Sequence, residues 1–395
     1  MYPIAYQGVD TLDVAIMGAA SDEVLATLET YQGYAKDDKY NKFGVPLLLG
    51  SEHRQFIIKA HGKIGGYRYT LVDTKTGSIF SVKNERQQDL WNFFVSTRAH
   101  SLLSRGYEAM KQEIDACLAA MGAAPKAYSV NRIDYAFDVI APDFVLDMAH
   151  FVAPKNAKVS PYYVAGHHLS DHGDKLPIGS VMRGGRFESV TIAKMPGRQV
   201  IVYDKTSAAK VQQTPYWFEA WGVDPTDPSK RVYRVEVRAG KDAWGSLIGP
   251  SERRDYQTIE ARHQPFVSLA LDQIRYVTDR AEVSNVTRAQ LHPLWDDVRS
   301  AVELMSERPE PPLTPAYVME LMRKQRVAMA MAQGFGNLNN LFILQGHSPA
   351  YIAANYARLA SEHARGYVKE IGADWHAKKL DRIAERQGVF LGGHE

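Results

Sequence analysis

Three strand-like segments carry charged residues on what would be one face of a β-sheet, and this feature constrains the fold most. The segments are 131–139 (NRIDYAFDV), 200–205 (VIVYDK) and 232–238 (VYRVEVR). Successive side chains of a strand point to opposite faces of the sheet. Ile133 and Tyr135, for example, would share the face opposite Asp134. Side by side, the three strands predict a sheet whose apolar face packs on helices and whose other face is polar.

The polar face would gather charged groups of both signs. It would hold three carboxylates and four cations: Asp134, Asp138 and Glu236, with Arg132, Lys205, Arg234 and Arg238. Neighbouring carboxylates repel one another unless a cation lies between them, and oxygen ligands alone suit Mg²⁺ or Mn²⁺. The surrounding cations suit a polyanionic substrate. The residues indicate a phosphodiester site, and the alternative is a solvated antiparallel face with cross-strand ion pairs and no such function.

The rest of the chain predicts an α+β fold: two related antiparallel sheet-plus-helix halves followed by a small all-helical C-terminal domain. Strands are predicted at 10–17, 56–60, 67–72, 78–83, 129–139, 189–193, 198–204 and 231–237. Helices are predicted at 102–121, 143–151, 251–279 with a bend at Pro265, 316–332 and from 349 onward. Prolines in Arg308–Pro315 disfavour helix and predict an extended spacer. The predicted boundaries are 1–126, 127–282, a connector at 283–315, and 316–395.

Composition excludes several classes of protein. The formal net charge is +2, so the total charge does not indicate nucleic acid, and a local basic face would have to make any DNA contacts. Cys117 is the single cysteine, which excludes an intrachain disulfide and a thiolate metal site. The sequence lacks the Gly-Lys-Ser/Thr motif of a phosphate-binding loop, which argues against an ATPase or helicase. Neither a signal peptide nor a membrane span is predicted, so we expect a cytoplasmic protein.

The charged segments also carry a resemblance to a known family. Segments 132–138 (RIDYAFD), 203–205 (YDK) and 234–238 (RVEVR) stand in the order and approximate spacing of motifs in Rep_trans-type replication initiators. These are rolling-circle initiators and relaxases of plasmids, filamentous phages and integrative elements. The segment 8–12 (GVDTL) and the start of the helix near residue 102 are similar too. The resemblance covers roughly residues 5 to 280 and leaves out the C-terminal third.

The resemblance implies a fold distantly related to the HUH endonucleases and a metal-assisted tyrosine nucleophile. The tyrosine would nick one DNA strand and become linked to its 5′ phosphate, for rolling-circle replication or strand transfer. By position, Asp134 and Glu236 would bind the divalent metal, with Asp138 as a further ligand, and Lys205 would contact the phosphate. Arg132, Arg234 and Arg238 would contact DNA. Implied partners are origin duplex and single strand, a host helicase or polymerase, and a second copy of the chain.

The nucleophile is the point at which the sequence departs from the family pattern. Family members commonly place a tyrosine shortly after the third motif, where this chain has Trp244. Tyr256 is the first substitute, since Glu260 and His263 would follow at one and two turns on the predicted helix. Tyr276 is the second. The alternative is a non-catalytic DNA-binding or regulatory protein with the same fold, for which no tyrosine would be needed.

Other features admit a functional and a plain interpretation. His167, His168 and His172 lie near two aspartates and would suit a transition metal, but their flanks predict a solvated loop. The glycine-rich turn 62–66 holds Lys63 and would suit a hairpin that touches backbone phosphates. Basic residues and tyrosines alternate in the C-terminal helices, which would suit duplex DNA, a partner protein or simply solvent.

Overall fold

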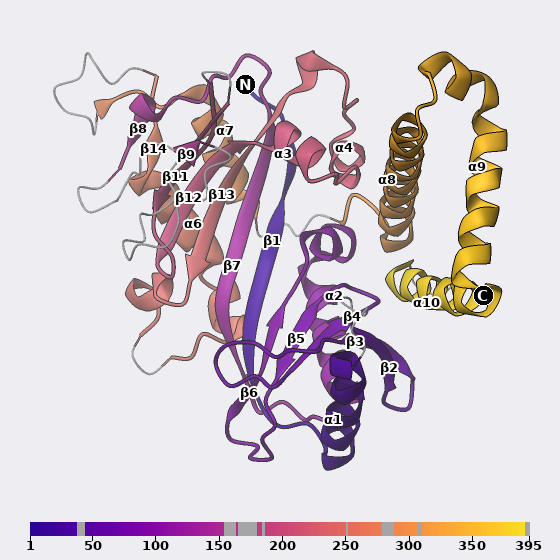
Figure 1. Cartoon of the computed structure of the whole chain (residues 1–395). Coiled ribbons are helices and arrows are strands. Elements are labelled where there is room, and N and C mark those ends of the chain that lie inside the picture. Colours follow the sequence, from indigo (N-terminus) through magenta and orange to yellow (C-terminus); the bar gives the residue numbers. More distant parts are fainter. Residues whose placement is uncertain are drawn as a thin grey trace. The chain divides into compact units, whose positions relative to one another are not determined.

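A single mixed sheet organises the larger part of the computed structural model (Figure 1). The structure describes residues 1–37, 44–153, 163–164, 180–183, 186–249, 252–278, 288–305 and 310–391. The described strands follow the order β2-β3-β4-β5-β6-β1-β7-β13-β12-β11-β10-β9. The ten strands from β2 to β11 pair antiparallel throughout, and β9 pairs with β10 in parallel.

The first half of the chain contributes one side of this sheet and the second half contributes the other. The first side holds β1 (Ile4–Met17), β2 (Val45–Leu49), β3 (Arg54–Ile58), β4 (Tyr69–Asp73), β5 (Ile79–Val82) and β6 (Trp91–Ser96). The second holds β7 (Ala127–Ile140), β9 (Tyr163–Val164), β10 (Ser180–Arg183), β11 (Arg186–Ala193), β12 (Arg198–Asp204) and β13 (Val232–Gly240). In each half the first strand pairs with the last, and β1 pairs with β7. The two predicted halves therefore share one sheet.

Alternation along the strands explains which face is covered by helices. Ile133, Tyr135 and Phe137 on β7 are fully buried in one large apolar core, as the sequence predicts. The helices that contribute to this core are α1 (Asp22–Asp37), α2 (Ala99–Ala120), α5 (Tyr256–Glu260), α6 (His263–Gln273) and α7 (Pro293–Glu303). Burying each large apolar side chain stabilises the fold by roughly 1.5–3 kcal/mol. Cys117 lies in this core as a small apolar residue.

The opposite face of the sheet is covered at one end by two short helices. They are α3 (Lys205–Val211) and α4 (Tyr216–Trp221), which follow β12 directly. The aromatic side chains of α4 are buried there, Trp217 and Trp221 among them. Strands β1, β7 and β13 run beneath this cover and continue past it, and the part of their polar face beyond α4 is called the open face below (Figure 1).

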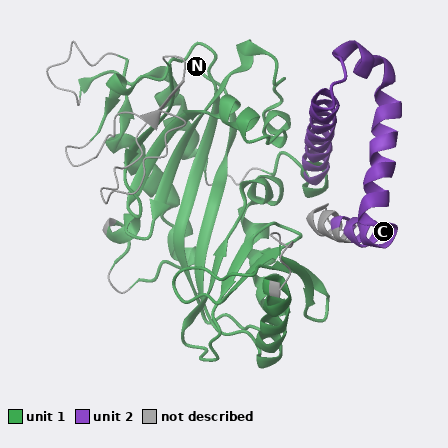
Figure 2. Ribbon diagram, viewed as in Figure 1, with its two compact units in different colours: residues 1–318 green, residues 319–395 purple. Residues whose placement is uncertain are grey.

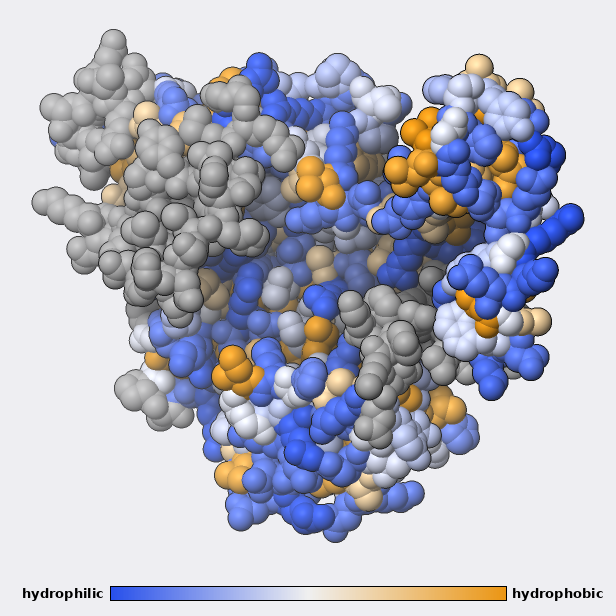
Figure 3. All heavy atoms as spheres, viewed as in Figure 1, coloured by the Kyte–Doolittle hydropathy of each residue, from blue (hydrophilic) through white to orange (hydrophobic). Residues whose placement is uncertain are grey.

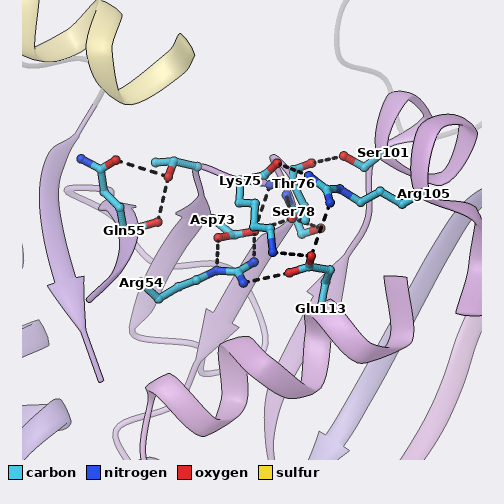
Figure 4. Close-up of polar contacts among 10 residues, drawn as sticks. Arg54, Gln55, Asp73, Lys75, Thr76, Ser78, Ser101, Arg105 and Glu113 are labelled. Carbon is cyan, nitrogen blue, oxygen red and sulfur yellow. Dashed lines mark hydrogen bonds and ion pairs between the residues drawn. The ribbon is translucent and has the colours of Figure 1, made fainter. Parts of the chain in front are cut away.

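A buried polar network fastens the outer strands of the first half to α2 (Figure 4). Arg54 of β3 donates two hydrogen bonds to Asp73 at the end of β4, at 2.8 and 2.7 Å, and a third to Glu113 of α2 at 2.8 Å. Asp73 also accepts from the Thr76 hydroxyl at 2.6 Å, in the turn that leads to β5. Lys75 pairs with Glu113 at 2.6 Å. These hydrogen bonds and ion pairs connect β3, β4 and the turn before β5 to α2.

Two predicted helices differ from the structure. Segment 143–151 forms a 3₁₀ turn at Met148–His150 and then β8 (Phe151–Val152), which pairs with β14 (Arg275–Tyr276). Asp147 caps the 3₁₀ turn, and the residues after the turn pair with β14, so the predicted helix does not form there. In place of the single helix predicted at 251–279, α5 ends at Glu260, α6 covers His263–Gln273, and β14 follows. Pro265 lies in the first turn of α6, where its missing N–H costs nothing, rather than at a bend.

The chain forms two compact units, residues 1–318 and 319–395 (Figure 2). The second unit consists of the greater part of α8 (Pro315–Leu344) together with α9 (Pro349–Ile371) and α10 (Ala373–Leu391). Ser348 caps α9 by accepting from the Tyr351 amide at 3.3 Å, with Pro349 in the first turn, where the helix is predicted to begin. A small core of Phe342, Ile352 and Leu359 joins α8 to α9. Among the described helices, none combines the length and the apolar character that a bilayer crossing requires.

Candidate functional site

The centre of the polar face is a buried ion pair between two strands. Arg234 on β13 lies directly opposite Asp138 on β7 and donates two hydrogen bonds to its carboxylate, at 2.5 and 2.7 Å. It donates a third, at 2.5 Å, to Asp10 of β1. The indole of Trp221 donates to Asp138 at 2.8 Å. Arg234 is 0% exposed, so this predicted DNA contact is enclosed by protein in the structure.

Asp10 joins the site because of an irregularity in β1. The pairing of β1 with β7 shifts register between Val9 and Thr11, on either side of Asp10. Such shifts redirect a side chain relative to its neighbours. Burial raises the pKa of Asp10, but the charges of Arg234 and Lys205 outweigh it and lower the pKa overall. In the sequence, Asp10 is noticeable only because it lies in segment 8–12, which resembles the family. No role was predicted for Asp10 itself.

Trp217 of α4 lies between the two buried cations. Its ring is 4.2 Å from the Arg234 guanidinium and 4.6 Å from the Lys205 ammonium. Tyr6 of β1 meets the same ring edge-on at 5.3 Å. Burial, together with the positive charge of Arg234, lowers the pKa of Lys205 to about 8. A lysine that loses its proton near neutral pH is a feature of functional sites.

The shifted pKa of Lys205 should make the free energy of unfolding depend on pH. Between about pH 8 and the ordinary lysine value of 10.5, the unfolded chain still binds a proton that folded Lys205 has released. The free energy of unfolding should therefore rise with pH across this window, by up to about 3 kcal/mol. In Lys205→Met the rise should disappear, and this variant should be more stable than the wild type at neutral pH. Urea unfolding at both ends of the window measures the difference.

The control for that measurement is Lys210→Met, on the exposed side of the same helix. It should keep the wild-type pH dependence. An identical rise in Lys205→Met and the wild type would show that Lys205 is not the group responsible.

Beyond the cover of α4, two carboxylates and two guanidiniums face one another. Asp134 accepts hydrogen bonds from Arg132, at 2.9 Å on one oxygen and at 3.0 and 2.5 Å on the other. Glu236 accepts from Arg238 at 2.6 Å, and Arg238 also lies 3.7 Å from Asp134. Burial raises the pKa of Asp134 to about 7, and the negative charge of Glu236 contributes to the rise. Both arginines are about a third exposed or less, at 32% and 27%.

The three predicted metal ligands are already engaged by protein donors. Asp138 has both carboxylate oxygens occupied by Arg234, and Asp134 has both occupied by Arg132. Glu236 gives one oxygen to Arg238 and the other to Tyr203. Within the part of the chain that the structure describes, no three His, Cys, Asp or Glu residues are grouped to hold a metal ion. As arranged, the three carboxylates do not fit a shared Mg²⁺ or Mn²⁺, because each faces a guanidinium.

Tyr203 is the hydroxyl that the structure brings to this face. Tyr203 is on β12 and lies opposite Arg234 of β13. Its hydroxyl donates to Glu236 at 3.2 Å and accepts from the Lys205 ammonium at 3.5 Å. Burial raises its pKa well above the ordinary value for tyrosine. The sequence places Tyr203 and Lys205 on one face, but nothing in it singled out Tyr203 as reactive. The signal that would have found it is the cross-strand pairing with β13.

Tyr256 lies on the other side of the sheet. Its ring packs against Tyr128 of β7 and Tyr107 of α2, at centroid distances of 5.0 and 6.5 Å, beside the apolar core. Its hydroxyl is buried and makes no hydrogen bond to any residue that the structure describes. Burial raises its pKa well above the ordinary value. The structure therefore does not bring Tyr256 to Asp134 and Glu236.

Tyr276 is likewise held away from the polar face. Its hydroxyl donates to the Val145 carbonyl at 2.9 Å and accepts from the Asp147 amide at 3.0 Å. Its ring packs among Phe144, Phe151 and neighbouring histidines. Burial raises its pKa to about 12. These contacts give Tyr276 a structural role in joining β14 to the loop before β8. The predicted histidine cluster at 167–172 lies outside the described residues.

No protein-family model matches the chain, and no curated protein matches it. Among solved structures, a rolling circle replication initiator protein from Geobacillus stearothermophilus is similar over 78% of this chain and 97% of its own. The two share 16% sequence identity, and their TM-score is 0.36.

Proposed function

We propose that this chain initiates DNA replication by nicking one DNA strand on the polar face of the sheet. The observation that carries the proposal is the grouping of Tyr203, Glu236 and Lys205, a nucleophile, a base and a cation within hydrogen-bonding reach. Nucleophilic catalysis requires such a base beside the hydroxyl. Origin duplex, a host helicase or polymerase, and a second copy of the chain remain proposed partners.

The proposed reaction is a transesterification. The Tyr203 hydroxyl oxygen attacks the phosphorus of a DNA phosphodiester, and its proton passes to Glu236. The bond from phosphorus to the 3′ oxygen breaks, and the departing oxygen takes a proton from water. The product is a 5′-phosphotyrosine and a free 3′ hydroxyl. Lys205 and Arg238 supply positive charge beside the phosphate, where it offsets charge that develops during attack.

A divalent metal stays a separate proposal that requires a rearranged site. Asp134 and Glu236 would have to lose Arg132 and Arg238 before their oxygens were available to Mg²⁺ or Mn²⁺. The reaction above includes no step through a metal. Comparing Mn²⁺ with chelator in the nicking assay tests the requirement directly.

The nicking assay uses labelled single-stranded oligonucleotides that tile the DNA around the gene for this chain. A covalent adduct should appear on a denaturing gel, and Tyr203→Phe should lower its yield at least about 100-fold, because the attacking oxygen is removed. Tyr256→Phe and Tyr276→Phe are the matched controls and should form adduct normally. An adduct that survives in Tyr203→Phe and disappears in either control would transfer the role to that tyrosine.

A non-catalytic DNA-binding protein is the second candidate function. The observation in its favour is that arginines occupy all three predicted metal-site carboxylates, which gives the face a closed set of ion pairs. Tight binding to the same oligonucleotides without any adduct, with Mn²⁺ and with chelator, would support it and overturn the nicking proposal.

A further inference from the structure

The open face extends beyond the candidate site into the first half of the chain. Asp13 on β1 lies directly opposite Arg132 on β7 and directly opposite Ser96 on β6. Residues directly opposite in antiparallel strands project to the same face. The Ser96 hydroxyl donates to Asp13 at 2.6 Å, which agrees with this placement. The same side of the sheet therefore runs from Arg132 across β1 to β6 without interruption.

Phe94 projects from this face, two residues along β6. It lies opposite Ala15 of β1 and opposite Ser81 of β5. Its neighbours Phe93 and Val95 are fully buried in the core on the other side. Phe94 is only partly buried, so part of its ring is accessible on the side of the sheet that faces away from the core.

Two lysines and a tyrosine surround Phe94. Lys63, in the exposed β3–β4 hairpin, has its ammonium 4.3 Å from the Phe94 ring centre. Tyr67, from the same hairpin, lies 6.2 Å from Phe94 between ring centres, and the Lys83 ammonium lies 5.4 Å from the Tyr67 ring. We call Lys63, Tyr67, Lys83 and Phe94 the aromatic platform. Cations beside partly exposed rings are the combination with which proteins bind single strands, through base stacking and phosphate contacts.

We propose that the aromatic platform binds single-stranded DNA and leads the strand along the open face to Tyr203. Bases would stack on Tyr67 and Phe94, and phosphates would contact Lys63 and Lys83. A single strand fits better than a duplex, because the faces of paired bases are covered by their neighbours. Arg132 adjoins the path where Asp13 would otherwise repel the backbone. Binding of the strand is inferred from the aromatic platform itself, and the direction of the strand toward Tyr203 rests on the proposed function.

Fluorescence anisotropy of the full chain with a labelled oligothymidine tests the platform. The double variant Tyr67→Leu/Phe94→Leu keeps apolar side chains at both positions and removes the stacking surfaces. Its dissociation constant should rise roughly tenfold or more. Tyr34→Leu, a substitution of an exposed tyrosine on α1, is the matched control and should bind as the wild type does. Lys63→Gln/Lys83→Gln should bind more weakly and show a smaller salt dependence.

Several outcomes would overturn the inference. Wild-type affinity in the folded double variant would do so, as would an absence of oligothymidine binding by the wild-type chain. Equal loss of affinity for a duplex of the same length would show that stacking on a single strand is not the mechanism. The adduct assay separates this inference from the proposed function. Stacking-dependent binding without adduct removes only the nicking proposal, and adduct without stacking-dependent binding removes only the platform.

Discussion

Replacing Arg234 with methionine is expected to lower the free energy of unfolding by about 3–5 kcal/mol. The substitution leaves the Asp138 carboxylate fully buried with one donor, the Trp221 indole, in place of three. Asp10 loses its closest cation as well. Leaving a charge buried without a partner costs more free energy than losing the attraction of the ion pair, because water cannot solvate the buried charge. Urea unfolding followed by circular dichroism at neutral pH measures the change.

Two controls separate a lost ion pair from a lost side chain. Arg234→Met combined with Asp138→Leu should recover much of the stability, since removing both charges of a buried pair is often close to neutral. Arg86→Met removes an exposed guanidinium, 69% accessible and paired with Asp22, and should cost less than about 1 kcal/mol. A cost below about 1 kcal/mol for Arg234→Met itself would contradict a buried, fully paired Arg234.

Trp217→Ala should destabilise the chain by a similar amount, about 3–5 kcal/mol, for a different reason. Its indole is 1% exposed and fills the space between α4, β1 and the two buried cations. Alanine leaves a cavity that the neighbouring rings cannot all close. Water entering beside Lys205 should also return the pKa of that lysine toward 10.5, so the rise in stability above pH 8 should weaken.

That second effect makes the Trp217 experiment specific. Unfolding free energies at pH 7 and at high pH should differ less in Trp217→Ala than in the wild type. Trp375→Ala, which removes a half-exposed indole in the second unit, should leave both the stability of the sheet and its pH dependence unchanged. A destabilised Trp217→Ala with the full wild-type rise would mean that this ring does not shield Lys205.

The sheet and its two faces were predictable because strand alternation is a local property. The pattern Ile133, Asp134, Tyr135 assigns each side chain to a face whichever strand lies next to it. The structure confirms the assignment: Tyr135 is in the core and Asp134 is on the polar face. The start of α9 follows from the Ser348 cap, whereas α8 continues to Leu344, past its predicted end at 332. A glycine with positive φ follows the end of each helix, Gly346 after α8 and Gly372 after α9, and is the local signal for these ends.

Pairings across strands were not predictable, because register depends on residues far apart in the chain. The sequence left two arrangements open, carboxylates grouped around a metal or ion pairs across the strands, and register set Arg234 against Asp138 and Arg238 against Asp134. The role suggested for Tyr256 depended on a helix that continues through His263. In the structure α5 ends at Glu260 and lies on the apolar side of β7, and no local pattern reports on which side of a sheet a helix packs.

The pairing of β1 with β7 has a consequence for how the chain acquires its structure during synthesis. When residues 1–126 have emerged, β1 can pair with β6 on one edge, but its other edge stays unpaired until β7 follows. An open edge of fourteen residues is a template for association with another nascent chain. Pairing with β7 covers this edge, so the strand pairing that joins the two halves also removes the template for association.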